Sequence, residues 1–90
     1  MIKRLNNHKY AQCHVEYNNY GISLWSYSTE VIMVRYDNFK IVMTCSGLYS
    51  MTTRRHISWF LEEYFPSISY YDIKKAVQGN YSLMFGRGVC

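Results

Sequence analysis

The chain has 90 residues, of which 49% are hydrophobic and 18% aromatic, and its net charge is +4. This apolar content excludes a disordered chain, and the length predicts a single domain over residues 1–90 without room for a separate catalytic domain. The longest apolar runs have the length of strands, far below the roughly 20 residues of a membrane span, so we expect no membrane contact.

The first nine residues are polar and predict a flexible leader. They include Lys3, Arg4 and Lys9 but lack the apolar stretch of a signal peptide. The whole chain has three cysteines, an odd and sparse set, whereas small secreted proteins carry paired and denser cysteines. Both features favour a location in the cytoplasm.

Strand patterns follow in the first half of the chain. Apolar and polar residues alternate over 13–17, and β-branched and aromatic residues fill the later segments. The predicted strands span residues 13–17, 22–27, 30–36 and 39–45.

Asp37 and Asn38 lie between the last two of these segments and predict a hairpin with a two-residue turn. That register places six large apolar side chains on one face, as the pairs Tyr36 with Phe39, Val34 with Ile41, and Ile32 with Met43. The other face then carries Met33, Arg35, Lys40, Val42 and Thr44.

The pattern becomes helical after Gly47 and predicts a first helix over residues 53–64. Thr52 or Thr53 suits the N-cap, and Pro66 ends the helix because the residue before a proline disfavours the α region. The apolar stripe of this helix consists of Ile57, Phe60, Leu61, Tyr64 and Phe65.

A shorter second helix is expected near the C-terminus. Ser69 and Asp72 form a capping box, and Gly79 provides the stop. Residues 81–85 suit a closing strand, and residues 86–90 a flexible tail. The predicted fold is thus α+β, an antiparallel meander of three to four strands packed against one amphipathic helix, with a short second helix.

The charges at the start of the first helix oppose its macrodipole. Arg54, Arg55 and His56 lie in the predicted first turn, where cations are unfavourable. Free backbone N–H groups, the hydroxyls of Thr52 and Thr53 and two guanidinium groups together would bind a phosphate or a carboxylate. The alternative is that the arginines are solvated or pair with acidic residues elsewhere.

Aromatic residues are more numerous than one small core can use, with ten tyrosines and two tryptophans. Such side chains supply rigid contact area and are enriched at interfaces. A codon bias towards tyrosine would explain the count equally well. The candidate partner contacts are Trp25, Tyr27, Tyr49, Trp59, Tyr70 and Tyr71.

Catalytic and metal-binding patterns are missing from the sequence. The cysteines and histidines do not have the paired spacings of structural zinc sites. The chain also lacks a glycine-rich phosphate loop and a suitable carboxylate pair. The sequence therefore predicts a protein that is not an enzyme and that needs neither a metal nor a cofactor.

The segment 49–61, YSMTTRRHISWFL, resembles a pattern met in small phage-encoded proteins of unknown function. The pattern comprises a strand end, a Ser-x-Thr-Thr cap, a histidine one turn later and an aromatic-leucine pair, and the likeness extends over residues 20–64. It implies the cytoplasm of an infected bacterium. In that setting small proteins without catalytic motifs, anti-CRISPR proteins among them, often inhibit a host machine by occupying its surface.

The resemblance thus implies an inhibitor of a bacterial defence protein or ribonucleoprotein complex, with the arginines and exposed aromatic residues as contacts. The alternative is a small basic regulatory protein that binds nucleic acid, with an affinity that falls steeply with salt. Its contacts would be Lys3, Arg4, Lys9, Arg54, Arg55, Lys74 and Lys75. A homodimer formed through a sheet edge is a further hypothesis.

Overall fold

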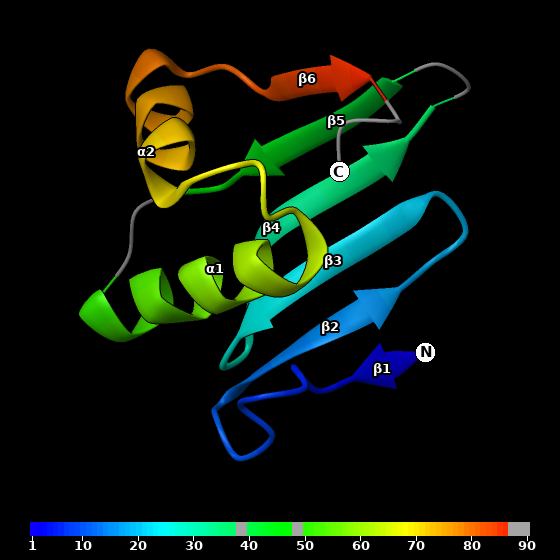
Figure 1. Cartoon of the computed structure of the whole chain (residues 1–90), viewed down its shortest axis with the longest axis vertical. Helices are drawn as coiled ribbons and strands as arrows, with labels where there is room; N and C mark the ends of the chain where they lie inside the picture. The colour runs from blue at the N-terminus through cyan, green and yellow to red at the C-terminus, as the bar shows by residue number, and fades with distance from the viewer. Residues whose placement is uncertain (38–39, 48–49, 87–90) are drawn as a thin grey trace.

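The computed structural model describes residues 1–37, 40–47 and 50–86. They form an α+β fold in which one antiparallel sheet of six strands, each paired with the next in sequence, is accompanied by two helices (Figure 1). The elements are β1 Ile2–Lys3, β2 Cys13–Tyr17, β3 Gly21–Ser26, β4 Thr29–Tyr36, β5 Lys40–Cys45, α1 Met51–Tyr64, α2 Tyr70–Gly79 and β6 Leu83–Gly86.

The two faces of the sheet differ because successive side chains of a strand point to opposite sides. Both helices lie on one side (Figure 1), and we call that side of the sheet the core face. Its buried strand residues are Val15, Ile22, Leu24, Ile32, Val34, Ile41 and Met43. The opposite side, the open face, carries Ile2, His14, Glu16, Ser23, Trp25, Glu30, Met33, Arg35, Lys40, Val42, Thr44 and Met84.

The hairpin of β4 and β5 has the predicted faces but a different register. Val34 pairs with Met43 and Ile32 with Cys45, two residues from the predicted partners. The innermost pair is Asp37 with Lys40, whose carbonyl accepts a hydrogen bond from the Asp37 N–H at 2.8 Å, so Asp37 is paired across the hairpin and does not belong to the turn as predicted. A shift by two keeps every side chain on its face, so the predicted division between the faces still applies. Asn38 and Phe39 lie outside the described residues.

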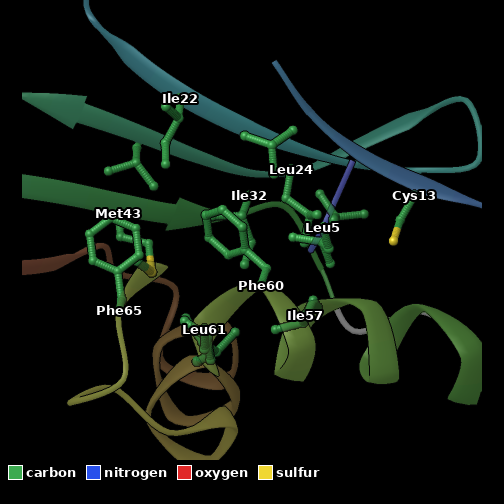
Figure 2. Packing of buried hydrophobic residues seen from close by; sticks show 14 of the residues in the cluster. Leu5, Cys13, Ile22, Leu24, Ile32, Met43, Ile57, Phe60, Leu61 and Phe65 are labelled. Atoms are coloured by element: carbon green, nitrogen blue, oxygen red, sulfur yellow. The ribbon is translucent and has the colours of Figure 1, made fainter. Parts of the chain in front are cut away.

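Helix α1 begins earlier than predicted. Its N-cap is Ser50, whose Oγ accepts a hydrogen bond from the Thr53 N–H at 3.3 Å, so the prediction of Thr52 or Thr53 as the cap is wrong. The helix ends at Tyr64, just before Phe65 and Pro66, as expected. Figure 2 shows its apolar stripe reaching towards the core face of the sheet, with Ile57, Phe60 and Leu61 buried.

The C-terminal elements agree with the sequence pattern. Ser69 and Asp72 form the predicted capping box of α2, and Asn80 in the left-handed region follows Gly79 as the C-cap. β6 confirms the predicted closing strand by pairing with β5. Gly86, assigned to a flexible tail, instead pairs with Lys40, and residues 87–90 lie outside the described residues.

The first nine residues do not form a detached leader. β1 pairs with β2, and Leu5 is completely buried in the core. The adjoining loop is fixed as well, because the Asn6 N–H donates to Glu63 Oε1 at 2.8 Å and the ring of His8 stacks on Trp59 at 3.7 Å. Strand pairing, the burial of Leu5 and these two contacts together anchor the segment.

We predict that Leu5→Ala lowers the free energy of unfolding by about 2–4 kcal/mol, because it leaves a cavity in a packed core. Urea denaturation measures the change. Ile2→Ala is the matched control, since Ile2 is 63% exposed and its truncation should change stability by about 0.5 kcal/mol or less. Equal urea midpoints for Leu5→Ala and the unmodified chain would show that the N-terminal segment is not docked.

Candidate functional site

The helical layer presents several of the predicted contacts to solvent. Helix α1 crosses the sheet, α2 lies beside the ends of β5 and β6 (Figure 1), and cationic residues on both helices are exposed. Lys75 Nζ lies 5.3 Å from the centroid of the Tyr71 ring, a cation–π arrangement. We call this surface the cationic face, and it consists of Thr52, Arg54, Arg55, Tyr71, Lys74 and Lys75.

A hollow of about 250 Å³ lies where the second half of α1 meets the loop 66–69 and the start of α2. It is lined by Ser58, Leu61, Glu62, Pro66, Ile68, Ser69 and Tyr70. Arg54 lies one turn before Ser58 on α1 and Lys74 one turn after Tyr70 on α2, so the helical period places each cation on the side of its helix that lines the hollow. The Tyr70 hydroxyl oxygen is buried and has no hydrogen-bond partner among the described residues.

The predicted anion site at the start of α1 is not assembled. The helix begins at Met51, so Arg54 and Arg55 lie in its second turn, where the macrodipole has little effect. Thr53 and His56 are buried against the sheet, while Thr52 and both arginines are exposed. The five residues therefore point to different sides of the helix, which contradicts their prediction as one site.

The buried polar residues of α1 form a network with the sheet instead. Ser26 Oγ lies 3.0 Å from Thr53 Oγ1 and 2.8 Å from His56 Nδ1. The rings of Tyr27 and Trp59 pack beside the imidazole, at 5.8 Å and 5.6 Å between centroids. Sequence reasoning missed Ser26, although its place two residues after Leu24 put it on the core face.

Burial lowers the pKa of His56 below its ordinary 6.5, and the nearby charge of His8 lowers it further. The imidazole is therefore neutral when the protein is folded at neutral pH. A serine beside a histidine is also the start of a nucleophile–base pair. Ser26 and His56 are each only 2% exposed, so this pair holds α1 on the sheet and does not face a substrate.

The predicted aromatic contacts are divided between several places. Trp25 lies on the open face, where it stacks with His14 at 6.0 Å. Trp59 is half-buried and covered by His8, so it fixes the β1–β2 loop. Tyr70 lines the hollow, Tyr71 is exposed on α2, and Tyr49 lies outside the described residues.

The predicted nucleic-acid contacts are also spread over the fold. Lys3 lies on β1 and Lys9 in the loop after it, whereas the other exposed cations belong to α1 and α2. Arg4 is engaged within the fold, because its Nη1 donates to the carbonyls of Ala11 and Cys13 at 2.8 and 3.3 Å. The predicted nucleic-acid contacts therefore come from four separate parts of the fold, namely β1, the β1–β2 loop, α1 and α2.

Residues 1–37, 40–47 and 50–86 contain no group of three or more histidine, cysteine, aspartate or glutamate side chains that could hold a metal ion. In the same part of the chain, neither helix combines the length and the apolar character needed to cross a membrane.

We predict that stability falls as the pH drops below about 6.5. The unfolded chain then binds a proton at His56 that the folded chain excludes, so the free energy of unfolding rises with pH in this window and levels off above it. Urea denaturation between about pH 5 and pH 7 measures the slope, at most about 1.4 kcal/mol per pH unit for one group. His56→Gln should flatten it and the control His14→Gln should not. Equal slopes in both variants would contradict the assignment to His56.

The comparisons with known proteins identify a family whose function is unknown. Neither a curated protein nor a solved structure matches the chain. Residues 2–76, which run from β1 into α2, match the model of a family of unknown function, DUF8033. Because this match covers most of the sequence, the chain belongs to the DUF8033 family.

Proposed function

We propose that the chain is a non-catalytic binding protein that attaches to an acidic surface of a partner protein through the cationic face and the hollow between α1 and α2. The observation that carries the proposal is a hollow lined by residues of α1, of the loop after it and of the start of α2, with the exposed cations Arg54 and Lys74 one helical turn from its lining residues Ser58 and Tyr70. A pocket surrounded by charged and polar residues is a common arrangement at the centre of protein interfaces.

The hollow would hold the anchor of the interface. Leu61, Pro66 and Ile68 supply apolar lining, and the buried Tyr70 hydroxyl needs a hydrogen-bond partner. A partner side chain with an apolar body and a polar tip suits this combination. Arg54, Arg55, Lys74 and Lys75 would steer an acidic surface towards it, which mainly raises the association rate.

The identity of the partner is proposed from the resemblance to small phage-encoded proteins. We propose a bacterial defence effector, a protein or a ribonucleoprotein complex, which the chain inhibits by occupying its surface in the cytoplasm of the infected host. The second candidate, nucleic-acid binding, needs the cations of β1 and the β1–β2 loop to act together with those of the helices.

A tagged pull-down from a bacterial lysate, with and without nuclease, tests the proposal. We expect the same defence effector to be captured in both samples. With that effector purified, charge reversal in the double variant Arg54→Glu/Arg55→Glu should weaken binding at least about tenfold, through loss of steering and of interface contacts. Filling the hollow with Ser58→Trp should also weaken it.

Lys3→Glu is the matched control, because it reverses an exposed charge on β1, away from α1 and α2. Its affinity for the effector should stay within about twofold of the unmodified chain, since a rim charge outside the interface contributes little. Capture that disappears with nuclease, together with equal losses from Lys3→Glu and the arginine double variant, would support nucleic-acid binding and contradict the proposal.

A further inference from the structure

The open face carries apolar side chains that neither helix covers. Ile2 and Met84 are each 63% exposed and Met33 is 37% exposed, and they lie on β1, β6 and β4. A hollow of about 290 Å³ runs over β4 and β5 on this face. It is lined by Glu30, Val31, Met33, Arg35, Thr44 and Ser46.

The charges along β4 are arranged with opposite signs at opposite ends of this hollow. Glu30 pairs with Trp25 near one end of the strand, and Arg35 pairs with Gly21 and Val42 near the other. Met33 lies between them on the same face. A β-bulge between these positions brings Glu30 to the same face as Arg35, although the two are five residues apart in β4. Their partners Trp25 and Gly21 are four residues apart in β3, so roughly 13 Å of strand separates the two charges.

Such a strand is complementary to itself when it is turned end over end. Consider a two-fold axis that lies in the plane of the interface, runs perpendicular to β4 and passes near Met33. This axis places Glu30 of one copy opposite Arg35 of the other. Because the interface is symmetric, the same contact forms twice. The two Met33 side chains meet at the axis, each beside the hollow of the other copy.

We propose that the open face binds a second copy of this chain, giving a face-to-face dimer held by two Glu30–Arg35 pairs around Met33. The molecule measures 34 × 29 × 20 Å and Figure 1 shows the sheet spread across the view down its shortest axis. A face of this size can supply the roughly 800 Å² per partner of a standard interface. The cationic face stays free on both outer sides.

The axis also predicts one unfavourable contact. Glu16 lies in the same cross-strand row as Ser23 and Met33, so the axis brings the two Glu16 carboxylates close together. The two negative charges repel each other across the axis. Glu16→Gln removes this repulsion and should therefore strengthen the dimer. A dimer formed through a sheet edge would not respond in this way.

Sedimentation equilibrium over a concentration series, with reductant present, tests the proposal. The unmodified chain should show a monomer–dimer equilibrium. Glu30→Arg and Arg35→Glu should each weaken it by about tenfold or more, because each creates two like-charge contacts. An equimolar mixture of these two variants should form a heterodimer with restored affinity, which also shows that both are folded. Lys74→Glu, on the cationic face, should leave the equilibrium unchanged.

Three results would overturn the proposal. The first is an unmodified chain that stays monomeric at the highest concentration reached. The second is a dimer that neither charge reversal weakens. The third is two folded, monomeric variants whose mixture remains monomeric, since the pairing of Glu30 with Arg35 would then be absent.

Discussion

The packing of α1 against one face of the meander is the contact on which the rest of the structure depends. Phe60 and Ile57 of α1 point towards Leu24 and Ile32 of the sheet, and Leu5 from the N-terminal segment lies in the same core (Figure 2). With both helices on that face, neither helix covers the other face of the sheet, where Ile2, Met33 and Met84 are exposed. A 90-residue chain that buries one side of its sheet has an entire second side for contacts.

A small polar network determines which residues of α1 point outward. Ser26 Oγ is hydrogen-bonded to Thr53 Oγ1 and to His56 Nδ1, so α1 cannot rotate about its axis without leaving buried polar groups unpaired. This fixed rotation keeps Arg54 and Arg55 exposed and aims Ser58 and Leu61 at the hollow beside α2. Arg54 and Arg55, which suggested an anion site at the start of the helix, thus belong to the cationic face.

Local signals predicted much of the fold. The alternation of apolar and polar residues predicted β2 to β5, and the Ser69–Asp72 capping box with Gly79 predicted α2. These features depend on residues that are close together in the sequence. The exact turn and the cap of α1 were missed, since Asp37–Asn38 and Ser50 or Thr52 are all plausible by composition. β1 was missed because two residues carry no periodicity and its pairing with β2 is a distant contact.

The candidate site was less predictable than the fold. The exposure of Arg54, Arg55, Lys74 and Lys75 follows from helical periodicity, but the hollow between α1 and α2 arises only when the helices pack. The role of His56 also depends on Ser26, thirty residues away in the chain. The charge pattern of the open face needed the strand register, which tertiary contacts determine.

The accessibility of the methionines tests the central claim, a sheet with one covered and one open face. Met43 is buried on the core face, Met33 and Met84 lie on the open face, and Met51 is exposed on α1. We would follow their oxidation by peroxide with mass spectrometry at several protein concentrations. The account predicts that Met43 stays protected throughout, that Met51 always reacts, and that Met33 and Met84 react in dilute but not in concentrated protein. Oxidation of Met43 as fast as that of Met33 in dilute, folded protein would contradict it.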